Sequence, residues 1–275
     1  MEEGQPSRTA FGAAMHRAVH QLIDKPVLFK DPLAVRILGL PEADLLASDV
    51  AKRAAMRAHI VARSLLAEGA LSAAYERGVR QYVLLGAGFD TFAYRNPHPD
   101  LKVFEVDFPT SQAWKRQRLE AIGVDPAAAT FADIDFERET LSHALSRAGF
   151  DLAAPAVFAW LGVMMYLTPD AVRTTFTAVG AMAKGSEIVF DYGRPTEDAH
   201  LLVRRYVAET RQRLADLGEP ILTTLRPPEL AALLTACGFS EVEDLDGPAL
   251  NKRFLRDSNL AMPPGSVGHS VRARV

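Results

Sequence analysis

The chain has 275 residues, 48% of them hydrophobic and 24% charged, which is ordinary for a globular protein with a sizeable core. Its 31 lysines and arginines against 34 acids give a net charge of −3 and no basic run, which argues against a nucleic-acid or anionic-membrane partner. Cys237 is the single cysteine, so an internal disulfide is excluded and a cytoplasmic protein is expected. The polar start MEEGQPSRTA is unlike a signal peptide, and the longest apolar stretch, 152–167, is shorter than the roughly 20 residues of a membrane span.

The first 75 residues have helical patterns and no strand signal. Residues 7–24 carry apolar side chains at helical spacing, and further helices are expected over 31–38 and 48–77. We expect residues 1–75 to form a helical cap or lid on a core formed by residues 76–275.

His16 and His20 lie four residues apart on the first of these helices. That spacing can chelate a metal, but no third ligand follows in a recognisable pattern. We therefore expect a polar helix face here and no metal site.

From residue 81 the pattern changes to strands alternating with helices, which is typical of a doubly wound parallel sheet. The sequence predicts an α/β fold with a seven-stranded sheet, helices on both faces and an antiparallel pair of strands at the end. The expected strands cover 82–85, 102–106, 130–134, 156–160, 187–191, 241–245 and 269–273. The expected helices cover 110–122, 138–148, a segment from Pro169, an insertion at about 196–217, and 227–237.

The stretch 81–91, QYVLLGAGFDT, predicts a buried strand that runs into a glycine turn. Gly86 and Gly88 let the backbone turn sharply and let a ligand approach without meeting a Cβ, although a lone GxG is also an ordinary strand-to-helix turn. Thr91 stands where a dinucleotide motif has its third glycine, and Asp90 would set a carboxylate at the start of the next helix, where it repels a pyrophosphate. This turn suits an adenosine ligand that lacks phosphate and carries positive charge, such as S-adenosylmethionine.

Acids follow the next two predicted strands. Asp107 lies 21 residues after Gly86, and Asp135 lies 28 residues after Asp107. Asp107 can accept hydrogen bonds from both hydroxyls of a ribose, and Asp135 can accept from an adenine amino group with Phe136 against the ring. Each acid alone also fits a helix cap. Because ligands bind at the carboxyl ends of parallel strands, the two acids and the glycine turn together favour a nucleoside pocket.

Four segments in series resemble the core motifs of the leucine carboxyl methyltransferase-like family: QYVLLGAGFDTFAYR, FEVDFPTSQAWKRQRL, ADIDFERETL and FAWLGVMMYLTP. That family is a branch of the class I S-adenosylmethionine-dependent methyltransferases, well populated in actinobacteria, and the N- and C-terminal segments are similar to it as well. The resemblance implies a Rossmann-like class I methyltransferase fold, S-adenosyl-L-methionine as cofactor and a small-molecule acceptor. It implies cofactor-binding roles for Arg63 (the methionine carboxylate), Gly86, Ala87, Gly88, Asp107 (the ribose), Phe108, Asp135 and Phe136 (the adenine), and Leu161.

One departure from the family pattern concerns Leu161, where many relatives place a glutamate. A cofactor contact from this position is expected to be apolar or made by the backbone. We expect O-methyl transfer to a carboxylate or hydroxyl. A carboxylate is already ionised at neutral pH and needs no general base, so no catalytic residue is predicted. Arg17, Lys25 and Arg194 are the candidate cations for the acceptor.

Two other functions fit parts of the pattern. A nicotinamide-dependent oxidoreductase shares the glycine turn and an acid about 20 residues later, but Asp90 and Thr91 count against it. A non-catalytic S-adenosylmethionine-binding protein would keep the fold without turnover, and Leu161 is its main support.

Overall fold

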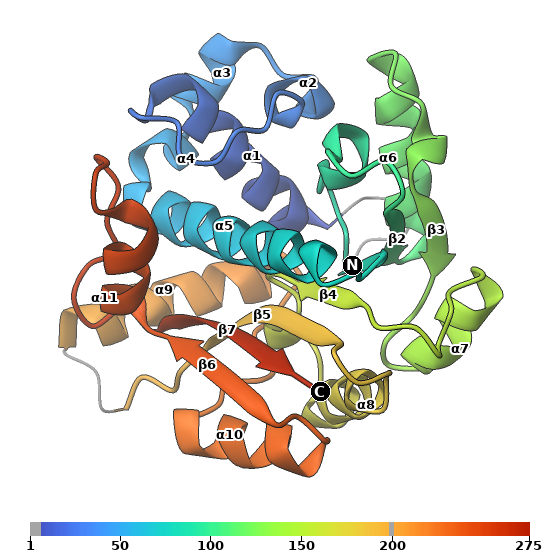
Figure 1. Cartoon of the computed structure of the whole chain (residues 1–275). Coiled ribbons are helices and arrows are strands. Elements are labelled where there is room, and N and C mark those ends of the chain that lie inside the picture. Colours follow the sequence, from blue (N-terminus) through green and yellow to red (C-terminus); the bar gives the residue numbers. More distant parts are fainter. Residues whose placement is uncertain (1–6, 198–200) are drawn as a thin grey trace.

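Seven strands form one sheet in the order β3-β2-β1-β4-β5-β7-β6 in the computed structural model, which describes residues 7–197 and 201–275 (Figure 1). Neighbouring strands are parallel except for β7, which runs antiparallel to both β5 and β6. This arrangement confirms the predicted seven-stranded α/β sheet. The strands are β1 (Gln81–Leu85), β2 (Lys102–Asp107), β3 (Thr130–Asp133), β4 (Val157–Trp160), β5 (Glu187–Gly193), β6 (Glu241–Leu245) and β7 (Gly268–Arg274).

The burial of the strand residues agrees with the hydrophobic patterns of the segments that form strands. Every residue of β1 and β4 is buried, as their short apolar runs predicted for strands covered on both faces. Val83 and Leu85 of β1 enter one hydrophobic cluster, whereas Tyr82 and Leu84 enter the cluster on the opposite face. β6 is an exposed strand at one edge of the sheet, and its acidic side chains suit an edge that pairs no further.

Helices cover both faces of the sheet and make up the N-terminal region. Before the sheet lie α1 (Arg8–Ile23), α2 (Ala34–Leu38), α3 (Glu42–Ala47), α4 (Asp49–Lys52) and α5 (Ala54–Glu76). The later helices are α6 (Pro109–Ala121), α7 (Leu141–Arg147), α8 (Pro169–Gly180), α9 (Leu201–Asp216), α10 (Pro227–Ala236) and α11 (Gly247–Leu250). Short helical turns are η1 (Phe92–Arg95), η2 (Pro126–Ala128), η3 (Met164–Tyr166) and η4 (Asn251–Leu255).

The helices form layers on either side of the sheet. α5 lies along one face, and α8 and α10 cover the other (Figure 1). Leu66 and Leu71 of α5 pack with the strands on the first face, and Phe176 of α8 packs with them on the second. α1 to α3 form a further hydrophobic cluster that includes Phe89 of the glycine turn. The N-terminal helices therefore pack against the segment that follows β1.

The helix expected after Asp90 is wrong, because only the 3-10 turn η1 forms there. Oδ1 of Asp90 accepts a hydrogen bond from the N–H of Phe92 at 2.8 Å, which begins a tight turn. Asn96 then adopts an extended ψ of 120°, as expected for a residue that precedes a proline.

Other helix bounds also differ from expectation. The helix expected over 48–77 is broken at Arg53, whose φ of −94° and ψ of 62° are not helical, and α3 precedes it unpredicted. The helix expected over 138–148 begins only at Leu141. Part of the insertion expected over 196–217 lies outside the described residues, and α9 forms the described remainder.

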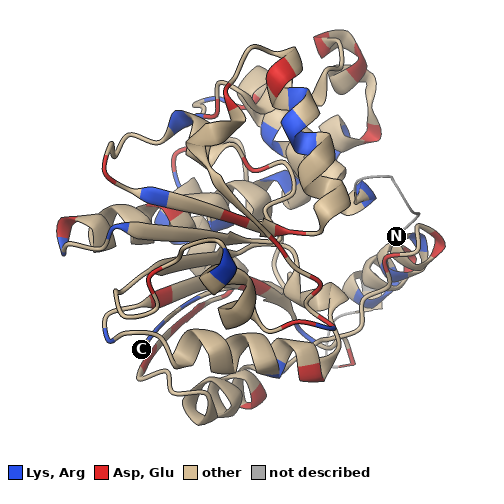
Figure 2. Cartoon of the chain, turned by 90° about the vertical axis from the view of Figure 1, so that its right-hand side faces the viewer, with Lys and Arg blue, Asp and Glu red and all other residues tan. Residues whose placement is uncertain are grey.

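Charges of both signs are interspersed over the helices and strands in the view of Figure 2. Within the described parts of the chain, no helix is both long and apolar enough to cross a membrane.

Candidate functional site

The glycine turn after β1 has the backbone conformation that its sequence predicted. Gly86 and Gly88 have φ of 64° and 47°, a region that residues with a Cβ rarely adopt. The N–H groups of Gly86 and Ala87 both donate to the carbonyl of Val106, at 2.7 and 3.2 Å, so the turn is fixed to the end of β2. A Cβ on Gly86 would lie 2.3 Å from Cγ2 of Val163, in the segment after β4. Glycine is therefore required where these two segments meet.

Asp107, at the end of β2, holds the turn in place. Its Oδ2 accepts from the N–H of Gly88 at 2.6 Å, and its Oδ1 accepts from the N–H of Phe108 at 2.7 Å. Phe108 is the N-cap residue of α6 and provides no side-chain cap, so Asp107 links the glycine turn to the start of this helix. Each carboxylate oxygen has two lone pairs, so the carboxylate can accept a further hydrogen bond beyond those from the two N–H groups and from the Ser111 side chain. Burial raises the pKa of Asp107, although the two N–H groups oppose that shift.

Asp135 and Phe136 follow β3, on the other side of β2 from the glycine turn. Oδ1 of Asp135 accepts from the N–H of Glu137 at 3.0 Å, and the Asp135 side chain remains 32% exposed. Phe136 is buried and packs near Trp160, with 6.4 Å between ring centroids. The loop thus presents a carboxylate beside an aromatic side chain that belongs to the core.

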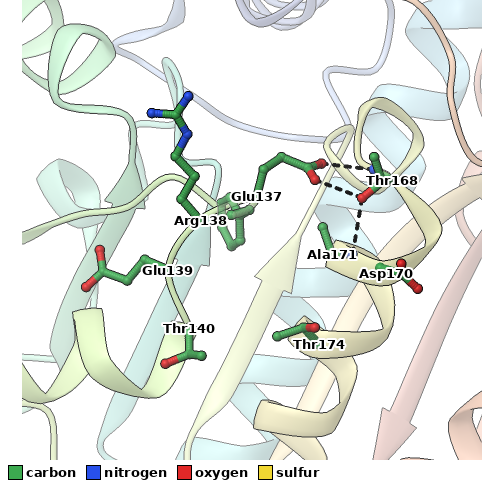
Figure 3. A pocket seen from close by; sticks show the side chains of 9 residues that line it. Glu137, Arg138, Glu139, Thr140, Thr168, Asp170, Ala171 and Thr174 are labelled. Carbon is green, nitrogen blue, oxygen red and sulfur yellow. Dashed lines mark hydrogen bonds between the residues drawn. The ribbon is translucent and has the colours of Figure 1, made fainter.

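A pocket of about 240 Å³ lies between this loop and the start of α8 (Figure 3). Glu137 borders it and points to Thr168, whose N–H and hydroxyl donate to the Glu137 carboxylate at 3.0 and 2.8 Å. Thr168 in turn caps α8 by accepting from the N–H of Ala171 at 3.3 Å. Glu137 therefore connects the loop before Leu141 to the start of α8. This contact explains why α7 begins later than expected.

Arg63, on α5, reaches the carboxyl ends of β4 and β5. Its Nη1 donates to Oδ2 of Asp191 at 2.8 Å, and both side chains are buried. Oδ1 of Asp191 accepts from the N–H of Gly162 at 2.6 Å, and Nε2 of His59 lies 3.3 Å from Oδ2. Burial alone would raise the pKa of Asp191, but Arg63, His59 and the Gly162 N–H lower it to about 2. A buried cation held by an ionised carboxylate thus stands beside the segment after β4.

Leu161 lies directly after β4 and before Gly162. Its side chain is half-buried and packs against the hydrophobic cluster on the α5 face of the sheet. This position therefore offers an apolar surface, as its sequence predicted.

α1 lies against the glycine turn. A Cβ on Gly88 would stand 3.1 Å from the Cβ of Ala10, and the rings of Phe11 and Phe89 meet edge to face with 5.7 Å between centroids. Nη2 of Arg17 donates to the carbonyl of Phe89 at 2.6 Å. The first helix therefore covers backbone that a ligand at this turn would approach.

The three cations predicted for the acceptor have separate surroundings. Arg17 is buried and lies 3.6 Å from Asp31 in addition to its bond to the turn. Lys25 is exposed, and its backbone N–H donates to Asn259 at 3.3 Å. Arg194 is half-buried after the end of β5. Arg17 thus supports the turn. These contacts do not bring any two of the three cations together.

His16 and His20 on α1 are buried, so the polar helix face predicted from their spacing is wrong. Nε2 of His20 accepts from the N–H groups of Leu28 and Phe29, both at 3.1 Å, which leaves Nδ1 to donate to Asp24 at 2.9 Å. This pairing accounts for His20. Within residues 7–197 and 201–275, no group of three or more His, Cys, Asp or Glu is placed to hold a metal ion.

His16 lies in a cationic environment. Its Nδ1 is buried and has no hydrogen-bond partner in the described part of the chain. Burial lowers the pKa of His16 to about 3, and the charges of Arg57, Arg53 and Arg63 act in the same direction. The imidazole is therefore neutral at pH 7 and is a weak base.

Glu219, shortly after α9, completes the N-terminus of α1. Its Oε1 accepts from the N–H of Arg8 at 2.9 Å, and its Oε2 accepts from the N–H of Thr9 at 3.1 Å. The hydroxyl of Ser7 accepts from the N–H of Ala10 at 3.1 Å. The first helix is thus joined to a residue 211 positions later in the chain.

A family model described as leucine carboxyl methyltransferase matches residues 10–180, which is more than half of the chain. The chain belongs to the leucine carboxyl methyltransferase family. YktD of Bacillus subtilis (strain 168), named for S-adenosyl-L-methionine-dependent methyltransferase activity, is 28% identical over 292 residues, which cover 95% of this chain and 96% of YktD. A protein of Mycobacterium sp. (strain JLS) named for the same activity is 35% identical over 216 residues, covering 73% of this chain and 70% of the relative. The crystal structure of a DUF574 family protein from Streptomyces avermitilis shares the fold with a TM-score of 0.55, over 95% of this chain and 96% of that chain at 16% identity.

As a member of this family, the chain is an S-adenosylmethionine-dependent methyltransferase with a class I fold. The enzyme class, the cofactor and the fold class predicted from the sequence are confirmed.

The sequence patterns do not predict that Asp191 and His59 are neighbours of the proposed cofactor residue Arg63. One signal was available for Asp191, because it stands near the carboxyl end of a predicted strand, as Asp107 does on β2. His59 precedes Arg63 by four residues on α5, so the two side chains lie on one helix face.

Proposed function

We propose that this methyltransferase family member transfers the methyl group of S-adenosylmethionine to a carboxylate oxygen of a small molecule. The observation that carries the cofactor site of this proposal is the order of the residues along the sheet edge. In the strand order β3-β2-β1-β4, this edge carries Asp135, Asp107, the turn 86–88, and Gly162 beside Arg63. The ligand has its groups in the same order: adenine, ribose, sulfonium and amino-acid carboxylate. Four strand ends span about 14 Å at the usual strand spacing, which suits an extended nucleoside with an amino-acid chain.

The groups at these positions fit the ligand chemically. Asp107 retains lone pairs that ribose hydroxyls can use, and the exposed part of Asp135 can accept from an adenine amino group. Leu161 provides an apolar contact. The planar fork of Arg63 matches a carboxylate, and its burial strengthens that attraction.

A carboxylate acceptor is favoured because it needs no base and because His16 and Asp191, near Arg63, are too weak to act as one. His59, whose Nε2 lies 3.3 Å from Oδ2 of Asp191, would be the candidate base for a hydroxyl acceptor. A hydroxyl acceptor would need a group that takes its proton near neutral pH. His16, with a pKa lowered to about 3, is too weak a base, and Asp191, with a pKa lowered to about 2, is weaker still. The arginine charges that act on His16 would instead attract an anion.

Bound S-adenosylmethionine supplies an electrophilic methyl group on its sulfonium. The chain's own residues bind and orient the two reactants and exclude water from them. We propose that Arg63, the turn 86–88, Asp107 and Asp135 hold the cofactor across the sheet edge. Because a carboxylate acceptor carries no proton to be removed, no residue is assigned as a general base.

We further propose that residues 1–75 act as a lid on the core formed by 76–275, together with the helical insertion at 196–217. The support for this is the packing of Ala10 on Gly88 and the bonds of Glu219 to the start of α1. The single cysteine leads us to propose the cytoplasm as its compartment, which subcellular fractionation tests.

Methyl transfer is tested with S-adenosylmethionine labelled in the methyl group and a panel of small carboxylic acids, each matched with its alcohol and a phenol. Methyl esters release volatile labelled methanol in mild base, whereas methyl ethers do not. We expect base-labile label with one or more of the acids. Base-stable label would show a hydroxyl acceptor instead.

Calorimetry with S-adenosylhomocysteine and with NAD separates the remaining alternatives. Binding of S-adenosylhomocysteine together with turnover supports the proposal. Binding without turnover on any acceptor would favour a non-catalytic binding protein, and binding of NAD alone would overturn the proposed cofactor site.

A further inference from the structure

We infer that Asp191 is a positioning residue, which fixes the guanidinium of Arg63 where the methionine carboxylate of the cofactor binds; this inference rests on the proposed function. Asp191 lies on β5, outside the four strand ends that carry the proposed cofactor contacts. It acts through Arg63 and does not itself touch the ligand.

The carboxylate of Asp191 joins three segments that are distant in sequence. It receives Nη1 of Arg63 from α5, the N–H of Gly162 from the segment after β4, and Nε2 of His59 from α5, at 2.8, 2.6 and 3.3 Å. Its side chain is 1% exposed, so these donors surround it and leave no room for a ligand group. A single buried anion thus determines where the guanidinium stands relative to the end of β4.

Gly162 contributes the space that this arrangement needs. It has φ of 74°, and a Cβ built on it would lie 2.9 Å from both Nη1 and Nη2 of Arg63. The guanidinium therefore lies close over the backbone of Gly162, whose N–H is bound to the same carboxylate as Nη1. Both the location and the orientation of the Arg63 fork follow from Asp191 and Gly162.

Asp191 has two effects on a ligand carboxylate, and they have opposite signs. Its negative charge partly cancels the attraction of Arg63 for an anion. Its hydrogen bonds hold Arg63 in one geometry and so reduce the ordering needed on binding. We infer that the second effect is the larger, because a buried arginine without its partner would reorient to find another acceptor.

The test compares S-adenosylhomocysteine with 5′-methylthioadenosine, which has the same nucleoside and thioether but no amino-acid carboxylate. Asp191→Asn removes the charge at almost constant volume. We expect it to weaken S-adenosylhomocysteine about tenfold, the size of a lost hydrogen bond to a charged group, and to leave 5′-methylthioadenosine unchanged. Calorimetric Kd values for both ligands give the result directly.

Glu187→Gln is the matched control. Glu187 is also a buried carboxylate on β5 with arginine partners, Arg77 at 2.5 Å and Arg272 at 2.5 Å, but it lies at the opposite end of the strand. Glu187→Gln also removes one member of a buried ion pair on the same strand, but at the end away from the proposed cofactor contacts. We therefore expect no change in the affinity of either ligand. If Asp191→Asn does not fold, Asp191→Glu makes the same comparison, because it keeps the charge and displaces the carboxylate by one methylene.

The outcomes separate this inference from the function on which it rests. Equal weakening of both ligands by the Asp191 variant would show a general structural role, and unchanged or tighter binding of S-adenosylhomocysteine would show that orientation is not the dominant effect. Either result overturns the positioning role. Failure of the unmodified protein to bind S-adenosylhomocysteine would overturn the proposed function instead.

Discussion

Oδ2 of Asp107 accepts a hydrogen bond from the backbone N–H of Gly88 at 2.6 Å, so the acid predicted for the ribose also shapes the glycine turn. The two roles are compatible because the oxygen retains a second lone pair. A ligand that binds Asp107 and a ligand that lies over the turn therefore contact the same structural unit, because the carboxylate and the turn are hydrogen-bonded to each other.

Asp107→Ala is expected to cut the affinity for S-adenosylhomocysteine by on the order of 1–3 kcal/mol, because two ribose hydroxyls lose their acceptor. The fold should persist, with some loss of stability from the unpaired N–H of Gly88. Calorimetry on the folded variant measures the effect. Asp133→Asn is the control, because Asp133 is the exposed residue paired in register with Asp107 on the neighbouring strand. An unchanged Kd in the Asp107 variant would remove this residue from the cofactor site.

Arg63→Lys is expected to weaken S-adenosylmethionine and S-adenosylhomocysteine by similar factors, because the carboxylate that Arg63 is proposed to bind is the same in both. Turnover at saturating cofactor should change little, since uniform binding does not lower the chemical barrier. Steady-state kinetics together with binding titrations check this. Arg77→Lys, at the C-cap of α5, should alter neither quantity. A collapse of saturated turnover with both affinities intact would instead place Arg63 on the acceptor side.

Amide exchange tests the proposed lid. We expect protection in residues 7–40 to rise when S-adenosylhomocysteine is added, because α1 packs on the turn that the ligand is proposed to contact. α10, on the opposite face of the sheet, serves as the internal reference and should not change. Equal exchange with and without ligand in residues 7–40 would contradict a lid.

The lowered pKa of Asp191 predicts a specific loss of stability in acid. An acid whose pKa is lower in the folded state stabilises the fold above its unfolded pKa, and this contribution disappears as the pH falls from 3.8 to about 2. The free energy of unfolding of the unmodified protein should therefore approach that of Asp191→Asn across this interval. Urea unfolding of both proteins at several pH values measures the difference. A difference that stays constant through the interval would mean that Asp191 is not paired as the structure shows.

The sheet could be predicted from the sequence because the information is local. Short apolar runs such as 82–85 and 156–160 need only their own composition to be recognised as strands buried on both faces. The acids at the strand ends could be predicted for the same reason, since chain order places Asp107 and Asp135 at a shared edge.

Contacts between distant segments could not be predicted in this way. Arg63 and Asp191 are 128 residues apart, and no periodicity in either segment identifies the other as its partner. The burial of His20 could not be predicted from the sequence for a related reason. A polar side chain on a helix suggests an exposed face unless its buried partner, here Asp24, is known.

Because Glu219 caps α1, the N-terminus of this helix can be completed only late in the synthesis of the chain. Two of the first N–H groups of α1, those of Arg8 and Thr9, receive their acceptor only from residue 219. At roughly 5–20 residues added per second, about 10 to 40 seconds separate the synthesis of the two ends of this contact. Throughout that interval these two N–H groups can bond only to water or to temporary partners. α1 therefore reaches its final capped form only after translation has passed α9.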